Sequence, residues 1–189
     1  AVQAQELLLH YDFNPFGTSY PNLGSLNAPL TPRGNFQAHG AAGSGVSGQV
    51  ADVAWDSSAN TTQGAATPVN NAALTTPAGG LDLSALEGFT ITFWFRTEQS
   101  LNSDSAVRFV YKADRATAVV GEGITLRSLA GALELRIGGS SGEAVLVSYN
   151  FGTASGYNRV GDWIFVAITW DGAEVRFYCG GRDYKLVPA

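Results

Sequence analysis

One stretch near the C-terminal end of the chain, GDWIFVAITWDGAEVRFYCGG at residues 161–181, constrains the fold most strongly. Asp171 and Gly172 suit a tight turn, because glycine adopts positive φ without steric cost and aspartate tolerates it. After the turn, apolar and polar residues alternate, which predicts a strand with Phe177 facing inward. Before it, residues 163–168 are nearly all apolar, as in a strand that is covered on both faces or lies in the middle of a sheet. The stretch therefore predicts an interior hairpin of a large antiparallel sheet.

Length and composition favour one domain over residues 1–189. The chain is 45% hydrophobic and 11% aromatic, which suffices for a substantial core. Its formal net charge of −5 and its scattered basic residues argue against nucleic acid as a partner. No apolar run reaches the roughly 18 to 20 residues that a membrane span needs, so we expect no membrane span.

Several other segments carry strand patterns separated by glycine-rich intervals, with no long helix between them. Such spacing predicts an all-β sandwich or barrel. In residues 14–80 we expect long ordered loops broken by short strands near 49–55 and 70–76, because so long a loop without regular structure is unusual. The clearest strand patterns lie at 6–13 (ELLLHYDF), 89–97 (FTITFWFRT), 106–113 (AVRFVYKA), 123–139 (GITLRSLAGALELRIGG) and 143–151 (EAVLVSYNF).

Three of these segments, in this order, carry a family resemblance: LLLHYDF, then FTITFWFRT, then the hairpin with its Trp-x-x-Val-Ala-x-Thr-Trp-Asp-Gly run from Trp163 to Gly172, followed by Phe177, Tyr178 and Gly181. They resemble the laminin-G-like (LamG) jelly roll of the concanavalin A-like lectin and glucanase superfamily. The resemblance implies an antiparallel two-sheet jelly-roll β-sandwich with the hairpin in the middle of one sheet. It also implies a non-catalytic module for carbohydrate recognition or cell adhesion, whose partner is a glycan or an extracellular protein.

Members of this family usually continue past such a hairpin, and their last strand typically returns beside the first. Here the hairpin is followed only by RDYKLVPA at 182–189, so we expect the usual C-terminal strands to be missing from this chain. The edge at Leu7–Tyr11 would then be open unless residues 14–80 fold back and cover it, and an open apolar edge recruits another strand. This gives an alternative function: a structural subunit that self-associates by strand pairing at that edge.

The acidic residues do not predict an enzyme. Glucanases of the superfold use closely spaced acids, roughly Glu-x-Asp-x-x-Glu, and no such run occurs here. Glu134 and Glu143 stand alone, whereas glycoside hydrolysis needs two facing carboxyl groups. The two histidines, His10 and His39, have no cysteine partners that would complete a usual zinc site. We therefore predict no catalytic residues.

Carbohydrate binding needs exposed aromatic rings beside polar groups. Tyr157 is the best candidate, because it lies in the glycine-rich segment GTASGYNRVGD with Asn158 and Arg159 next to it. The alternative is an ordinary loop tyrosine packed on its neighbours. The full set of aromatic candidates is Tyr20, Trp55, Tyr149, Tyr157 and Tyr178.

Calcium is the one cofactor that the resemblance implies, since many jelly rolls of this kind hold a Ca²⁺ ion on loops at one edge. Calcium takes six to eight oxygen ligands, many of them backbone carbonyls. Asp12, Asn14, Asp52 and Asp56 lie in the loop-rich N-terminal part and could contribute. The alternative is that these side chains stabilise turns through bonds to the backbone.

The residues at the start of the chain favour a secreted or cell-surface protein. The opening AVQAQE fits the small-residue pattern left around signal-peptide cleavage, and the chain contains no methionine. A single cysteine, Cys179, excludes an internal disulfide. Because it shares the inward phase of its strand, we expect a buried, inert thiol.

Overall fold

The computed structural model describes residues 5–14, 19–33, 40–56, 73–76, 86–98, 100–101, 107–113, 123–139, 142–150, 160–182 and 184–188. The chain forms two compact units, Ala1–Asp82 and Leu83–Ala189. Whether both belong to one domain over residues 1–189 stays a prediction.

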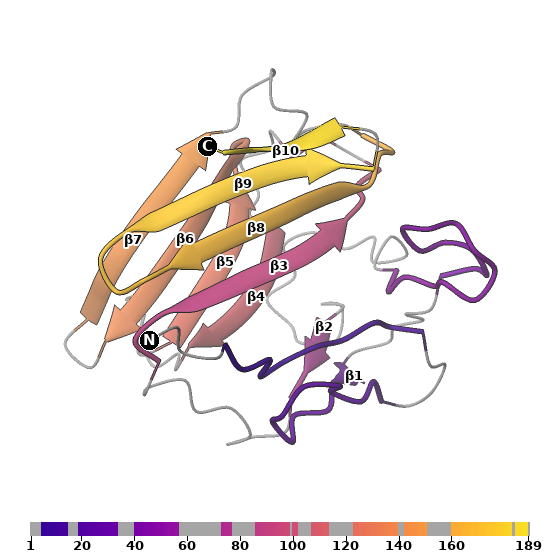
Figure 1. The fold of residues 1–189 in the computed structure, drawn as a ribbon, viewed down its shortest axis with the longest axis horizontal. Helices are drawn as coiled ribbons and strands as arrows, with labels where there is room; N and C mark the ends of the chain where they lie inside the picture. Colours follow the sequence, from indigo (N-terminus) through magenta and orange to yellow (C-terminus); the bar gives the residue numbers. More distant parts are fainter. Residues whose placement is uncertain are drawn as a thin grey trace. The chain divides into compact units, whose positions relative to one another are not determined.

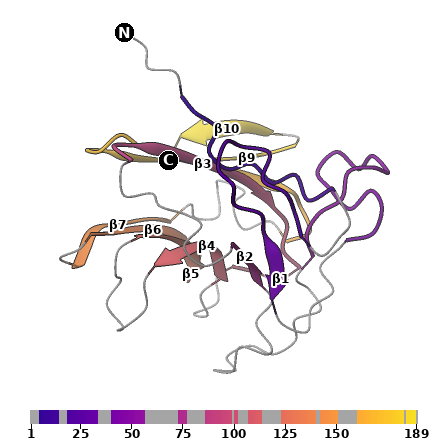
Figure 2. The same ribbon diagram turned by 90° about the horizontal axis from the view of Figure 1, so that it is seen from below.

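The second unit is built from two four-stranded antiparallel sheets (Figure 1). One sheet has the order β10-β9-β8-β3 and the other the order β4-β5-β6-β7, and the two form separate layers in Figure 2. No helix occurs among the residues that the structure describes, which confirms the all-β, two-sheet fold class. The strands are β3 (Phe89–Phe95), β4 (Val107–Ala113), β5 (Gly123–Leu129), β6 (Ala132–Gly139), β7 (Gly142–Asn150), β8 (Ile164–Trp170), β9 (Val175–Gly181) and β10 (Tyr184–Pro188).

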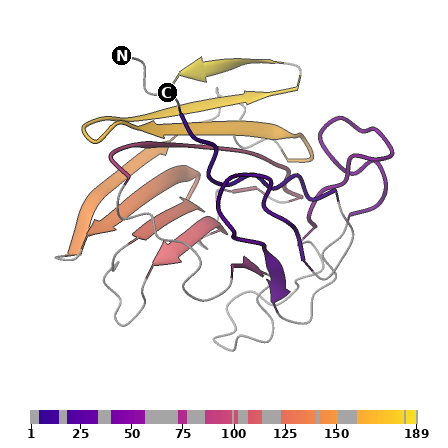
Figure 3. The ribbon, with the colours of Figure 1, turned by 60° about the horizontal axis from the view of Figure 1, so that its bottom comes forward.

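The hairpin β8–β9 lies inside its sheet, as the sequence predicts. β3 pairs with β8 on one side and β10 pairs with β9 on the other (Figure 3). Whether the usual C-terminal strands are missing stays a prediction, although one strand that the sequence pattern does not indicate, β10, follows the hairpin. Its pattern is short and ends in Pro188, and proline weakens a strand signal except at a sheet edge, which is where β10 lies.

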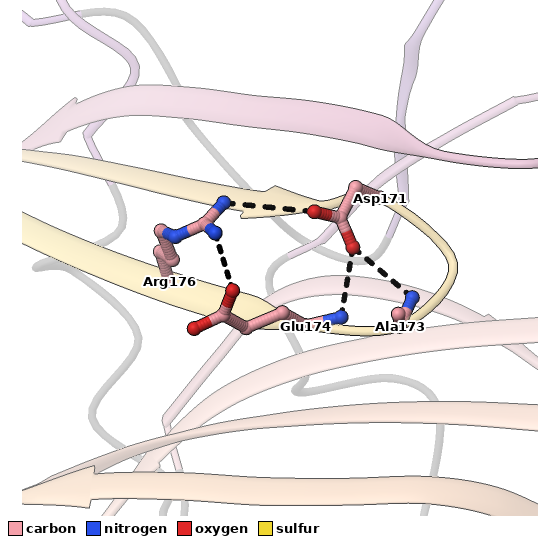
Figure 4. Close-up of polar contacts among 4 residues, drawn as sticks. All are labelled: Asp171, Ala173, Glu174 and Arg176. Atoms are coloured by element: carbon pink, nitrogen blue, oxygen red, sulfur yellow. Dashed lines mark hydrogen bonds and ion pairs between the residues drawn. The ribbon is translucent and has the colours of Figure 1, made fainter.

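The turn of this hairpin is fixed by one aspartate (Figure 4). Asp171 Oδ1 accepts hydrogen bonds from the backbone N–H groups of Ala173 (3.0 Å) and Glu174 (2.8 Å). These donors hold the pKa of the Asp171 carboxyl below its usual value. Gly172 has φ = 89°, a conformation that glycine adopts without strain. Arg176 then forms ion pairs with Asp171 (3.6 Å) and Glu174, so its charge is matched at the hairpin tip.

The core lies between the two sheets, where their inward side chains meet. Among the residues of the predicted strand segments, Phe95, Leu135, Ile164, Val166 and Phe177 are buried. Phe93 and Ile137, in the same segments, are partly buried and pack against this cluster. Cys179 is also buried, as predicted, and burial raises the pKa of its thiol to about 11. The inward and outward phases assigned to these strands are therefore confirmed.

The first unit contains one antiparallel pair among its described residues, β1 (Thr31–Arg33) with β2 (Ala73–Thr75). β2 falls inside the segment 70–76 that was predicted to hold a short strand. The strand predicted near 49–55 is wrong, because Val50 and Ala51 lie in a turn, residues 52–54 form no strand and Trp55 takes part only in a single β-bridge. Hydrogen bonds from Gly45 N to Asp52 O and from Asp52 N to Gln49 O close this turn, so this backbone is not available for a ladder.

The strand predicted at 6–13 is also wrong. In the described part, residues 5–14 form no strand, although three of their carbonyl groups accept hydrogen bonds from residues 23–26 of the same chain. The Asn22 side chain replaces further ladder bonds by accepting from His10 N (2.6 Å) and donating to Leu8 O (2.9 Å). Gly24 permits this approach, since an added Cβ would lie 2.5 Å from Leu8 O. Residues 22–26 thus already bond along one side of the segment that was predicted to be an open edge.

Candidate functional site: an aromatic and arginine strip

The outer face of the β10-β9-β8-β3 sheet presents an exposed pair of aromatic rings. Side chains alternate across a strand, so Trp94 points away from the core that Phe93 and Phe95 enter. Trp94 is paired in register with Phe165 of β8, and the two ring centres lie 5.1 Å apart. Trp94 is 38% exposed, although burying a ring of this size would be favourable. It therefore offers an uncovered aromatic surface.

A second pair continues this surface just beyond the paired ends of β3 and β8. The guanidinium carbon of Arg96 lies 5.4 Å from the centre of the Trp163 ring, a cation–π distance. The backbone N–H of Gly161 donates to the carbonyl of Thr97 (2.8 Å) and so ties the turn before β8 to the end of β3. We call the four side chains Trp94, Phe165, Arg96 and Trp163 the outer strip. β3 and β8, which carry the strip, lie side by side in Figure 1.

The rest of this outer face is smaller and more polar. Register places Thr92, Ala167 and Tyr178 in one cross-strand row. The next row contains Thr90, Thr169 and Arg176. Of the described side chains of this face, the two tryptophans and Phe165 therefore lie toward the end that carries the outer strip, and the next row offers the hydroxyl groups of Thr92 and Tyr178.

The residues predicted to bind sugar, Tyr157, Asn158 and Arg159, lie outside the described residues. The described chain resumes at Val160, three residues before Trp163 of the outer strip. Among the other aromatic candidates, Tyr20 is buried, so its predicted exposure is wrong. Tyr149 is exposed at its strand but stacks on Phe177, with ring centres 6.0 Å apart.

Sequence reasoning missed the strip as a binding surface. The signal was present, because Trp94 and Arg96 occupy the outward phase of FTITFWFRT. A tryptophan on an outward phase is notable, since the largest aromatic side chains are usually highly buried. The sequence does not show that Phe165 would lie opposite Trp94, or that Trp163 would lie under Arg96.

Three of the four residues proposed as calcium ligands, Asp12, Asn14 and Asp52, make loop-stabilising side-chain hydrogen bonds, and the fourth, Asp56, is exposed. Asp12 accepts from the backbone N–H (3.2 Å) and the side-chain amide (3.4 Å) of Asn14. Asn14 Oδ1 in turn accepts from Val53 N (3.0 Å). This oxygen therefore points toward the loop that contains Val53, whereas the amide nitrogen of Asn14 points toward Asp12. Asp52 accepts from Ser47 N (2.6 Å), and bonds with Ser47 lower the pKa of its carboxyl. The arrangement joins the two loops but fits turn formation better than a shared cation site.

Calcium binding stays a prediction. No group of three or more His, Cys, Asp or Glu side chains suited to a metal occurs in the described part of the chain, although backbone oxygens also ligate calcium. A cation bound only by the folded protein would raise its melting temperature by mass action. Equal melting curves in calcium and in EGTA would show that the folded protein binds no stabilising calcium ion.

Of the two glutamates named in the sequence analysis, Glu134 has a structural role, whereas the side chain of Glu143 lies outside the described part of the structure. Glu134, on β6, accepts from Arg127 Nε (2.6 Å) and from Arg136 Nη2 (3.4 Å). The carboxylate therefore lies in an ion pair with two guanidinium groups. Within the described residues, no helix is long and apolar enough to cross a membrane.

The family model that describes the concanavalin A-like lectin/glucanases superfamily, in its laminin-G-like form, matches residues 68–185, more than half of the chain. The chain belongs to this superfamily. No curated protein and no solved structure gives a significant match. Laminin-G-like domains are in general non-catalytic modules that bind glycans or proteins, and they are typically extracellular.

Proposed function

We propose that this LamG-like chain is a non-catalytic module that recognises carbohydrate, as a lectin or adhesion module does, through its outer strip. The observation that carries the proposal is the exposed Trp94 ring beside Phe165, continued by Arg96 over the Trp163 ring. Membership of the superfamily supports a lectin-like module.

The chemistry of the strip suits a sugar ring. One face of a pyranose presents mainly C–H groups, which pack on an aromatic ring, while its hydroxyl groups need hydrogen-bond partners. Arg96 supplies N–H donors in a plane, and its cation–π contact holds the guanidinium over the Trp163 ring. A donor held in place loses less side-chain entropy when the ligand binds.

We also propose that the chain has no glycoside hydrolase activity and that it acts outside the cell or at its surface. The ion pairs of Glu134 with two arginines support the first statement. The family's typical location supports the second. Reducing-sugar release from β-glucans, measured over a day at several pH values, should equal the buffer blank; turnover above it would contradict the proposal.

The test of the binding function is a glycan array probed with the wild type, Trp94→Ala and Leu146→Ala. Leu146 is the matched control, because it is also an exposed apolar residue (51%) but lies on β7 in the other sheet. We expect the wild type and Leu146→Ala to bind the same glycans and Trp94→Ala to lose them. A wild type that binds no glycan on the array would overturn the proposal.

A second candidate is the structural subunit that self-associates at Leu7–Tyr11. Leu7 and Leu23 are 60% and 53% exposed, which favours a contact there, whereas the bonds to residues 23–26 already use one side of the segment. Light scattering on the wild type and on Leu7→Ser separates the cases. Self-association predicts an oligomer that the substitution dissociates; a monomer at all concentrations would exclude it.

A further inference from the structure

The outer face that carries the strip offers an incoming ligand no unbalanced positive charge among its described residues. At the tip of the hairpin, Arg176 is paired with both Asp171 and Glu174 (Figure 4). One cation between two carboxylates leaves a local charge of about −1, and the lowered pKa of Asp171 keeps its carboxyl ionised. This end of the face therefore repels an anion.

The end of the face that carries the strip is balanced as well. Arg96 lies over the Trp163 ring, and Arg182 follows β9 in the turn before β10. Glu98 comes two residues after Arg96, Asp162 comes directly before Trp163, and both are exposed. Among the described side chains at this end, two are positive and two are negative, so together they carry no net charge, within a chain of formal charge −5.

A polyanion requires the opposite pattern. Affinity for sulfate, phosphate or repeated carboxylate groups comes from clustered arginine and lysine side chains that are not already paired with acids. A neutral sugar requires none of these, because its contacts are C–H groups on rings and hydroxyl groups at hydrogen-bond donors and acceptors.

From this charge pattern, and resting on the proposed function, we infer that the outer strip selects uncharged sugar units and discriminates against sulfated or carboxylated glycans. Trp94 and Phe165 supply the ring contact, and Arg96 acts as an oriented hydroxyl donor rather than as a counter-ion. The neighbouring Thr92 adds a hydroxyl group on the same face.

Affinity electrophoresis in native gels tests this directly. One gel series contains a neutral polysaccharide, such as soluble β-glucan, galactomannan or arabinan, and the other contains heparin or polygalacturonate. We expect a neutral polymer to retard the wild type and the anionic polymers to leave its mobility unchanged. In titration calorimetry, affinity for the neutral polymer should change less than about twofold between about 50 and 500 mM NaCl, since salt screens only charge–charge contacts.

Two variants tie the binding to the strip. Trp94→Ala should weaken binding to the neutral polymer by about tenfold or more, as for a central aromatic contact. Trp94→Phe keeps a ring in the same place and should retain most of the affinity. Circular dichroism on both variants, with Leu146→Ala as the control, separates lost contact from lost fold.

The outcomes separate this inference from the proposed function. Retardation by an anionic polymer, weakened by salt and lost in Trp94→Ala, would overturn the charge selectivity and leave glycan recognition by the strip standing. Binding to a neutral polymer that a folded Trp94→Ala retains in full would place recognition elsewhere and overturn the inference. No retardation by any polymer of either class would overturn the proposed function, and the inference with it.

Discussion

Replacing Phe177 by alanine tests the register on which the fold and the outer strip both depend. Phe177 is 3% exposed and faces Ile168 of β8 across the ladder. A buried Phe→Ala substitution costs about 3 to 5 kcal/mol, and more where the surroundings cannot collapse into the cavity. β9 is hydrogen-bonded to β8 on one side and to β10 on the other. We therefore expect a loss of about 4 kcal/mol in the free energy of unfolding.

Urea denaturation followed by tryptophan fluorescence measures this loss. With a denaturant slope of about 2 kcal/mol per molar, the midpoint should fall by about 2 M. Leu146→Ala is again the matched control, because that side chain is half exposed and its loss should cost within about 0.5 kcal/mol. A loss below about 1 kcal/mol for Phe177→Ala would refute the inward phase of β9, and with it the outward phase of the neighbouring positions.

Three further perturbations have defined outcomes. Gly24→Ala places a Cβ 2.5 Å from the Leu8 carbonyl oxygen, so a melting curve should show destabilisation by about 1 to 3 kcal/mol; an unchanged curve would contradict the close approach. Asp171→Ala should lower the melting temperature at pH 7 more than at about pH 2.5. A carboxyl with a lowered pKa stabilises the fold above its ordinary pKa and loses that effect as the pH falls through the lowered value. A difference in melting temperature between variant and wild type that is the same at both pH values would refute this. Cys179, with a pKa raised to about 11 by burial, should react with a disulfide reagent at pH 8 only after unfolding, and rapid reaction of the folded protein would show an accessible thiol.

The sequence predicts the second unit well because its strands carry their own periodicity. In FTITFWFRT, alternate residues must enter one side of the sheet, since successive side chains point to opposite faces. The structure buries Phe95 and leaves Trp94 exposed accordingly. The turn at Asp171 and Gly172 also depends only on neighbouring residues. Its side-chain acceptor and its residue with positive φ can both be recognised in the sequence.

The first unit was predicted poorly because its structure depends on bonds between distant residues. ELLLHYDF has the composition of a strand. However, the side chain of Asn22, more than ten residues away, hydrogen-bonds to the backbone carbonyl of Leu8 and the backbone N–H of His10. Similarly, the bond between Asn14 and Val53 joins two loops that no local pattern connects. Propensity is a weak guide where side chains compete with the backbone ladder for the same donors and acceptors.

The sequence by itself determined the fold class, the interior hairpin, the inward phase of the core strands and the burial of Cys179, because each follows from alternation along one segment. Only the tertiary structure decided which residues from different segments stand opposite each other. The pairing of β3 with β8 sets Trp94 against Phe165 and brings Arg96 over Trp163. Register between strands far apart in the sequence is set by packing of both faces and by the ladder as a whole, so a site built from cross-strand pairs appears only once the sheet has formed.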